Sequence, residues 1–395
     1  MGTKLPTSGT RSQRSLRPAL IVITVALLTS CGTTVQQTPP SASPATTQAP
    51  TAQASTASVP SVQTPSIPPS SASSLSSSRP VDAEPPDEPL AQRLSNEVSE
   101  PAAFLHLEAL QRIADENGGN RASPSPGYEA SVDYVVGVLR DAGYEVSTPT
   151  YPASGDQDDD VGPTLRNVIA QTRGGGQGSV VMIGAHLDSV QDGPGIVDNG
   201  SGVAALLEIA SRLGAATPTR NAVRFAFFGS EEEGAVGSTA YVESLSADER
   251  QQIKLYLNVD MVASPNAGYL VQGGKGGDLS TAGPPGSETV SQVLVDELAR
   301  TGVNAEIIEF VGDDESAFVE ARIPSGGAEN GDQEEKSDDQ ARAWGGQAGE
   351  EFDRCYHMAC DSLNNVNRVV LDHYLRALAG TVGSFAESTE NLPPR

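Results

Sequence analysis

The chain has 395 residues and is strongly acidic, with 51 aspartates and glutamates against 25 lysines and arginines and a formal net charge of −26. This charge argues against nucleic acids and anionic membrane surfaces as partners, because both repel an acidic protein. An acidic excess also favours solubility, but it indicates no particular activity.

The N-terminal region predicts export and lipid anchoring. Basic residues between positions 4 and 17 precede an apolar run at 19–28, which is too short for a permanent membrane span and is typical of a signal peptide. The run ends in Leu-Thr-Ser-Cys, which resembles a bacterial lipoprotein box with Cys31 as the lipidated first residue of the mature protein. We therefore predict a signal peptide at 1–30 and a lipid anchor at the outer face of the cell membrane. Partial release of the protein, or an ordinary cleaved signal, is the alternative.

Two further regions follow this signal. Residues 31–89 are dominated by Ser, Thr, Pro, Ala and Gln, a composition that predicts a disordered tether because it offers too little apolar surface to bury. From about residue 90 to residue 390 the composition is globular, and this length is enough for one domain with its own core. We expect this domain to be a monomer.

The globular region predicts alternating helices and strands. The expected helices are at 101–114, 128–142, 201–213, 287–301 and 366–385, and the expected strands are at 167–172, 180–183, 223–228, 255–259, 268–271 and 305–311. This alternation predicts an α/β fold with a mixed, mostly parallel central sheet and helices on both faces. In such a fold the catalytic groups gather at the carboxyl ends of the strands.

The segment 180–208 carries the first candidate site residues. Its apolar strand ends at His186 and Asp188, and a glycine-rich loop then leads through Asp198 into a helix. A histidine at a strand end is more often structural than a ligand, so this segment alone does not establish a site.

Two further strand ends carry carboxylates. The sequence Gly-Ser-Glu-Glu-Glu-Gly, which contains Glu231 and Glu232, follows the strand at 223–228, and Asp260 follows the strand at 255–259. Acidic residues directly after a buried strand are hard to explain as a solvated face. They indicate a site.

The last candidate residue, His357, lies between two cysteines. In an exported domain, Cys355 and Cys360 favour a disulfide over a pair of zinc-binding thiolates. Such a bridge would hold the short loop that carries Tyr356 and His357.

Together these segments supply two imidazoles and several carboxylates, which are ligands that suit Zn²⁺. The candidate set is His186, Asp198, Glu231, Glu232, Asp260 and His357. A pair of divalent ions needs a bridging carboxylate, and such a pair can activate water for hydrolysis.

Five short motifs occur in the order known from one peptidase family. They are H-L-D-S-V from His186, D-N-G-S-G from Asp198, G-S-E-E-E-G around Glu231, N-V-D-M around Asp260 and C-Y-H-M-A-C-D from Cys355. With these motifs the chain from about residue 99 resembles the M28 family of bacterial co-catalytic zinc aminopeptidases, in particular its secreted Streptomyces-type members. The resemblance implies the zinc exopeptidase, or phosphorylase/hydrolase-like, fold.

The resemblance also implies two zinc ions per chain and a role for each matching residue. His186 and Asp260 would bind the first ion, Glu232 and His357 the second, and Asp198 both. In relatives the peptide bond after the matching aspartate is cis, and we expect the same for the bond between Asp198 and Asn199.

Three further residues would act in the reaction itself. Glu231 would be the general base, Tyr356 would donate a hydrogen bond to the oxyanion, and Asp188 would orient His186.

The predicted function is therefore removal of the N-terminal residue from peptides that have a free N-terminus. A large apolar residue is the preference that the resemblance implies. The alternatives are another zinc hydrolase on the same fold, such as a carboxypeptidase or a glutaminyl cyclase, an inactive binding lipoprotein, and a structural wall protein.

The chain also departs from the family pattern. Residues 313–318 read Asp-Asp-Glu-Ser-Ala-Phe where relatives carry Ser-Asp-His or Ser-Asp-Tyr before the phenylalanine, and Gly312 stands at the place of a substrate-binding arginine. We predict that the acidic run 329–339 is a solvated loop, with a place at the rim of the pocket as the alternative.

Two histidines and one aspartate complete the candidates. His106 and His373 are predicted to be structural. Asp372 is a minor candidate for a Ca²⁺ ligand.

Overall fold

The computed structural model describes residues 88–153 and 163–394. The predicted signal peptide, Cys31 and the tether as far as residue 87 lie outside the described residues. Within the two described ranges, no helix combines the length and the apolar character that crossing a membrane requires.

The centre of the domain is a sheet of eight strands in the order β1-β4-β6-β5-β7-β10-β8-β9. Its strands are β1 Glu145–Ser147, β4 Val168–Gln171, β5 Gly176–His186, β6 Asn221–Phe228, β7 Ile253–Val259, β8 Leu270–Gln272, β9 Glu306–Ile308 and β10 Ser325–Glu329. The four central strands β6, β5, β7 and β10 run parallel, and so does the pair β8–β9, whereas β1–β4, β4–β6 and β8–β10 are antiparallel. The predicted mixed, mostly parallel α/β sheet is confirmed.

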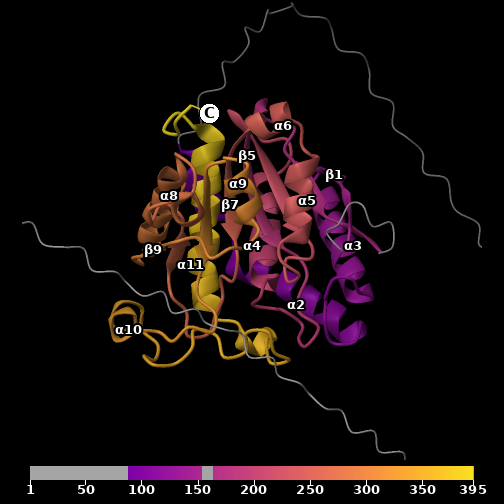
Figure 1. The fold of residues 1–395 in the computed structure, drawn as a ribbon, viewed down its shortest axis with the longest axis vertical. Helices are drawn as coiled ribbons and strands as arrows, with labels where there is room; N and C mark the ends of the chain where they lie inside the picture. Colours follow the sequence, from indigo (N-terminus) through magenta and orange to yellow (C-terminus); the bar gives the residue numbers. More distant parts are fainter. Residues whose placement is uncertain (1–87, 154–162, 395) are drawn as a thin grey trace, which may run out of the picture. The chain divides into compact units, whose positions relative to one another are not determined.

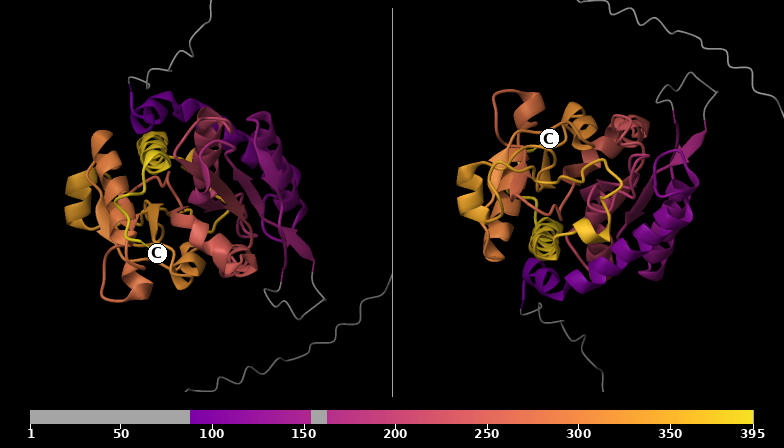
Figure 2. Two further views of the ribbon diagram at one scale, coloured as in Figure 1. Left: turned by 90° about the horizontal axis from the view of Figure 1, so that it is seen from above. Right: turned by 90° about the horizontal axis from the view of Figure 1, so that it is seen from below.

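Helices cover both faces of this sheet (Figures 1 and 2). One face packs against α4 Gly200–Leu213, α8 Ser287–Arg300 and α11 Arg368–Glu387, which α1 Leu90–Glu97, α2 Glu100–Glu116 and α3 Pro126–Asp141 surround. The other face packs against α5 Val236–Ser244, α6 Ala247–Gln252 and α9 Glu315–Glu320. The short elements β2 Thr150–Pro152, β3 Thr164–Arg166, α7 Leu279–Ala282 and α10 Asp338–Trp344 lie outside the sheet.

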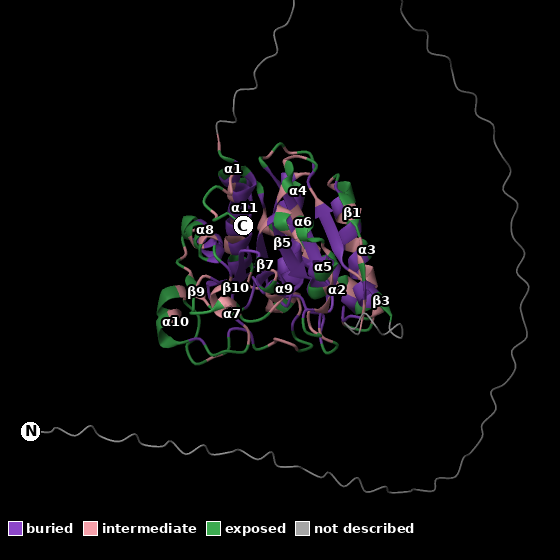
Figure 3. Ribbon diagram, turned by 45° about the horizontal axis from the view of Figure 1, so that its top comes forward, coloured by how far each residue is buried: buried purple, intermediate pink, exposed green. Residues whose placement is uncertain are grey.

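The alternation of side chains along the central strands divides the core into two parts. On β5, Val181 and Ile183 belong to the larger core on the side of α4 and α11, whereas Met182 belongs to the smaller core on the side of α5 and α9. Figure 3 shows the central strands and α4 as buried, with exposed residues on the outer elements. A strand that is buried on both faces reads as a continuous apolar run, and this explains why the sequence predicts β5, β6 and β7.

One central strand, β10, was not predicted. Its residues Ser-Gly-Gly-Ala-Glu lack the large apolar and β-branched side chains by which strands are recognised. The glycines have a packing reason: a Cβ at Gly326 would lie 2.9 Å from a methyl group of Val290 on α8. The absence of side chains lets α8 approach the sheet closely.

Candidate metal centre

The candidate ligands meet at the carboxyl ends of the central parallel strands. His186 is the last residue of β5, Glu232 lies four residues after the end of β6, and Asp260 directly follows β7. Asp198 precedes α4, and His357 lies on the connection between β10 and α11. This connection, orange to yellow in Figure 1, lies at one end of the sheet.

The distances place these five residues around two points that share one carboxylate. His186 Nε2 lies 3.1 Å from Asp198 Oδ1 and 3.4 Å from Asp260 Oδ1. His357 Nε2 lies 3.2 Å from Asp198 Oδ2 and 2.9 Å from Glu232 Oε2. Among the described residues, these are the two sets of three His, Cys, Asp or Glu side chains that could hold a metal ion. Asp198 belongs to both.

The chemistry of the two sets fits divalent metal ions. Each set contains one imidazole nitrogen and two carboxylates, which suits Zn²⁺. Asp260 Oδ1 and Glu232 Oε1 are buried without a hydrogen-bond partner, and a metal ion would satisfy both. Burial is the main cause that raises the pKa of Asp260 to about 8. Burial also acts to raise the pKa of Asp198, but hydrogen bonds with His186 and His357 hold it below its usual value.

Two of the three predicted catalytic side chains, Glu231 and Tyr356, line the space next to these sets. Glu231 belongs to neither metal-binding set, and burial is the main cause that raises its pKa to about 10. The ring of Tyr356 stacks on that of His357 with 3.8 Å between the ring centroids. Both Glu231 and Tyr356 line the cavity into which the two sets open. A general base and an oxyanion donor would have to lie there to reach a substrate.

Asp188, predicted to orient His186, contacts that histidine mainly through its backbone. The carbonyl oxygen of Asp188 lies 3.2 Å from His186 Nδ1, whereas the carboxylate lies 3.7 Å away. The same carboxylate accepts a hydrogen bond from the backbone N–H of Glu231 at 3.2 Å. Asp188 therefore links the end of β5 to the segment that carries the predicted base.

Two positioning residues were missed by the sequence reasoning. The carboxylate of Asp361 accepts hydrogen bonds from the backbone N–H groups of Val197 at 2.8 Å and Asp198 at 3.0 Å, and so fixes the shared ligand. Asn199 donates to the carbonyl of Val259 at 2.8 Å, which ties the start of α4 to the end of β7. The only signal for Asp361 was its place at the end of the C-Y-H-M-A-C-D motif.

Arg121 is a third missed residue, and no pattern in the sequence pointed to it. Its fully buried guanidinium donates to the carbonyl oxygens of Leu187, Pro194 and Gly195. Its backbone N–H also donates to Ser189 Oγ at 2.9 Å. Arg121 thus holds both ends of the loop that separates His186 from Asp198.

The ligand sets open into a cavity of about 260 Å³, which we call the metal cavity. Its lining residues are Glu231, Glu232, Gly234, Asp260, Met261, Val311, Asp313, Glu329, Asp332, Tyr356 and His357. None of them is a lysine or an arginine.

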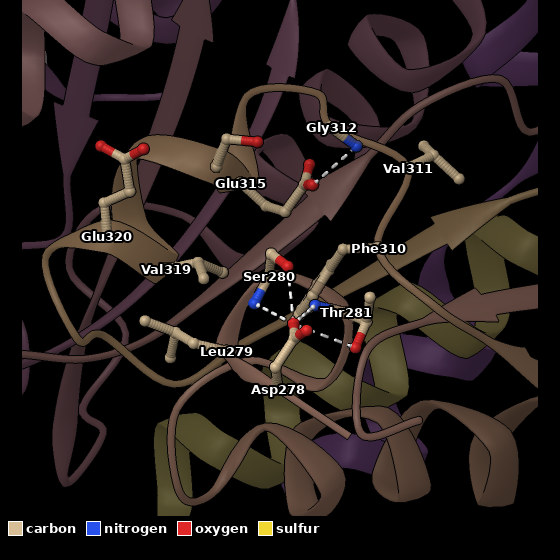
Figure 4. Close-up of a pocket in the computed structure, with 11 residues that line it drawn as sticks. Asp278, Leu279, Ser280, Thr281, Phe310, Val311, Gly312, Glu315, Val319 and Glu320 are labelled. Carbon is tan, nitrogen blue, oxygen red and sulfur yellow. Dashed lines mark hydrogen bonds between the residues drawn. The ribbon is translucent and has the colours of Figure 1, made fainter. Parts of the chain in front are cut away.

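A larger cavity of about 580 Å³ lies next to it, and the two share Val311 as a lining residue (Figure 4). Asp278 at its floor accepts hydrogen bonds from the N–H groups of Ser280 and Thr281, and Glu315 accepts one from the N–H of Gly312 at 3.2 Å. No predicted site residue lines this cavity, so the candidate site is the metal cavity.

The remaining predicted features also have positions in the structure. Cys355 and Cys360 form a disulfide, and the peptide bond between Asp198 and Asn199 is cis. Neither predicted structural histidine belongs to a metal-binding set. His106 Nδ1 lies 2.7 Å from the hydroxyl of Tyr134, and the ring of His373 packs edge-to-face on Tyr269. Asp372, the minor calcium candidate, pairs with Arg376 at 2.9 Å.

The run 329–339, predicted to be a solvated loop, is exposed at Glu334, Glu335, Asp338 and Asp339, as expected. Glu329 and Asp332 line the metal cavity, as the alternative expected. The prediction is wrong for two charged residues of the run. Glu329 is the last residue of β10 and only 8% exposed, and Lys336 is buried, donating to the carbonyl of Ala267 at 2.7 Å. Asp338 begins α10. The density of charge misled the prediction, because a buried charge with a defined partner has the same sequence pattern as a solvated one.

A family profile and two similar proteins relate this chain to peptidases. The sequence profile described as Peptidase family M28 matches residues 167–382. Leupeptin-inactivating enzyme 1 of Streptomyces exfoliatus is 42% identical over 316 residues, which cover 78% of this chain and 65% of the relative. The probable lipoprotein aminopeptidase LpqL of Mycobacterium tuberculosis is 34% identical over 449 aligned residues, which cover 79% of this chain and 90% of LpqL.

Solved structures share the fold at lower identity. BSAP, a zinc aminopeptidase from Bacillus subtilis, superposes with a TM-score of 0.60 at 16% identity, covering 74% of this chain and 96% of BSAP. The aminopeptidase from Aneurinibacillus sp. strain AM-1 gives a TM-score of 0.59 at 17% identity, covering 77% of this chain and 98% of the other.

Proposed function

This chain belongs to peptidase family M28 of zinc metallo-aminopeptidases, and we propose that it removes the N-terminal residue from peptides with the help of two zinc ions. The observation that carries the proposal is the position of Asp198, whose two carboxylate oxygens face the imidazoles of His186 and His357. A single carboxylate shared in this way is what a pair of neighbouring cations requires.

In this proposal the ligands divide between two sites. His186 and Asp260 would hold one zinc ion, Glu232 and His357 would hold the other, and Asp198 would contribute to both sites. When bound, zinc polarises a carbonyl group and lowers the pKa of water.

Glu231 moves the proton. It takes a proton from the attacking water and delivers it to the amine that leaves when the peptide bond breaks. Its position in the lining of the metal cavity, outside both metal-binding sets, supports this role. The hydroxyl of Tyr356 donates a hydrogen bond to the oxygen of the reacting carbonyl.

The acidic lining explains why the substrate needs a free N-terminus. A protonated α-amino group would compensate Glu231 and Asp260, whereas a neutral internal amide would leave these carboxylates without a partner. The preference for a large apolar first residue, which the resemblance implies, stays a prediction.

The alternative hydrolases differ in what they would need from this cavity. A carboxypeptidase would need a basic residue to bind the substrate carboxylate, and among the described residues no lysine or arginine lines the metal cavity. A glutaminyl cyclase would release a cyclised peptide and no free amino acid, so product analysis separates the two reactions. An inactive binding protein is disfavoured because every expected metal-binding residue is present, and so is Glu231.

The proposal extends to localisation. We propose that the protein is exported and anchored through a lipid on Cys31, and the name of the similar LpqL lipoprotein supports this. Cys31→Ala should move the protein from the membrane fraction to the soluble fraction in fractionated cells. Retention of the variant in membranes would contradict a lipid anchor.

Two variants test the catalytic assignment. Glu231→Ala should keep both zinc ions and lose about 10²- to 10⁴-fold in kcat, since it removes only the proton carrier. Asp198→Ala should lose both the activity and the bound zinc. The measurements are metal analysis and hydrolysis of leucine p-nitroanilide and of free and N-acetylated peptides, with and without a chelator. Parent-like hydrolysis by Glu231→Ala would show that the base is another residue.

A further inference from the structure

The lining of the metal cavity includes three carboxylates that the proposed reaction does not use. Asp313 lies on the connection between β9 and α9, Glu329 ends β10, and Asp332 follows it. We call these three residues the acidic wall. Within residues 88–153 and 163–394, no lysine or arginine lines the cavity to compensate them.

Two members of the acidic wall are held in place by one buried side chain. Gln272 on β8 is fully buried, and its Nε2 donates to Glu329 Oε2 at 2.8 Å and to Asp313 Oδ2 at 3.1 Å. Both amide hydrogens are used in this way, so the amide fixes the two carboxylates at the cavity wall.

Glu329 is the most buried member of the acidic wall. Its residue is only 8% exposed, and among the described residues its carboxylate has one side-chain hydrogen bond, on Oε2. Oε1 is left for whatever enters the cavity. Burial, with the charge of Asp313 as a further cause, raises the pKa of Glu329 well above its usual value. A buried carboxylate of this kind is stable as an anion only when a cation joins it.

The shape of the acidic wall favours an organic cation over a metal ion. Among the described residues, only the two sets that share Asp198 bring three potential ligand atoms within 4.8 Å of one another, and the acidic wall is not such a set. Met261 and Val311 line the same cavity and offer apolar contacts. Lysine and arginine side chains combine an aliphatic stem with a charged end, which matches this lining.

We propose that the acidic wall binds the cationic side chain of the first residue of the substrate, so that the enzyme prefers peptides that begin with lysine or arginine. This inference rests on the proposed aminopeptidase function, and it predicts a different first residue from the apolar one that the resemblance implies. Gln272 and Glu329 act as specificity-determining residues and take no part in the proton transfer.

The test compares lysine p-nitroanilide with norleucine p-nitroanilide, which has a similar linear side chain without the charge. The zinc-loaded parent should hydrolyse the lysine substrate with the higher kcat/KM. Glu329→Gln keeps the hydrogen bond with Gln272 and should lower the lysine-to-norleucine ratio on the order of a hundredfold, because it removes one partner of a buried charge pair. Glu309→Gln is the matched control, since Glu309 is an exposed acid near the cavity but outside its lining. It should leave the ratio unchanged.

The outcomes separate the two proposals. A parent that cleaves norleucine p-nitroanilide better than lysine p-nitroanilide overturns the acidic wall as a specificity site and leaves the aminopeptidase function standing, whether or not the variants fold. An equal fall in the ratio for Glu309→Gln also overturns it, because the effect is then long-range. A zinc-loaded parent that hydrolyses neither substrate nor any free peptide contradicts the proposed function itself. Zinc content and thermal unfolding of Glu329→Gln show whether the variant keeps its metal ions and its fold, so that a change in the ratio reflects binding. Asp313→Asn is a second variant of the acidic wall and is measured in the same way.

Discussion

The two walls of the metal cavity are built in different ways. On the ligand wall, Glu232 and Asp260 follow the ends of the parallel strands β6 and β7, and His186 ends the strand β5 between them. On the acidic wall, Asp313 and Asp332 lie on connections, and Glu329 ends a strand that has almost no side chains. The register of the sheet positions the strand-end ligands and also Glu329, whereas the positions of Asp313 and Asp332 depend on how the connections pack. We therefore expect changes on the ligand wall to abolish the reaction, and changes on the acidic wall to redirect it.

The largest effect is expected at Asp198, which belongs to both candidate metal-binding sets. Asp198→Asn keeps the volume but removes the shared charge, so both zinc ions should be lost and kcat/KM should fall roughly 10⁴-fold or more for every substrate. Metal analysis and p-nitroanilide assays measure this. Asp192→Asn, an exposed acid on the same loop, is the control. If Asp198→Asn binds two zinc ions as the parent does, the shared-ligand arrangement is wrong.

The next effect concerns the loop behind the ligand wall. Arg121→Ala leaves the buried carbonyl oxygens of Leu187, Pro194 and Gly195 without their donor, so the free energy of unfolding should fall by about 3 kcal/mol or more. Denaturant unfolding measures the change. Arg112→Ala, on the exposed side of α2, should cost far less. Equal losses would mean that the guanidinium does not hold the loop.

A smaller effect is expected where the ligand wall is supported indirectly. Asp361→Asn weakens the hydrogen bonds that fix Val197 and Asp198, and the affinity for zinc should drop about 10- to 100-fold. Competition with a chelator of known affinity measures it. Since the ligands themselves remain, activity should return at high zinc concentration. Activity that stays low under zinc saturation would assign Asp361 a direct catalytic role.

The smallest effect is expected on the outer part of the acidic wall. Asp332 is half-buried, and solvent screens its charge, so Asp332→Asn should lower the lysine-to-norleucine ratio only a few-fold. The same pair of p-nitroanilides measures it. If Asp332→Asn lowered the ratio more than Glu329→Gln does, Asp332 and not Glu329 would be the main partner of the cationic side chain.

The sequence predicted the ligand wall well for a physical reason. Apolar runs mark strands that are buried on both faces, and a polar residue directly after such a run lies at the strand end, as His186 and Asp260 do. Parallel neighbours then bring these residues together. The central sheet follows from the same signal.

The rest could not be predicted, because the decisive contacts are between segments far apart in the chain. Glu329 was placed in a solvated loop, since neither the two glycines of β10 nor the surrounding charges reveal a buried strand. Arg121 and Asp361 act on the backbone of loops that lie 66 or more residues away in sequence. Such pairings have no local pattern.

The single amide of Gln272 has a consequence for how this protein can change over evolutionary time. Because it anchors Asp313 and Glu329 together, and neither belongs to the metal-binding sets, the selectivity of the cavity can be rewritten by one or two substitutions. The reaction machinery is untouched by such substitutions. Homologues with this architecture can therefore differ in substrate preference and still keep the same metal-binding and catalytic residues.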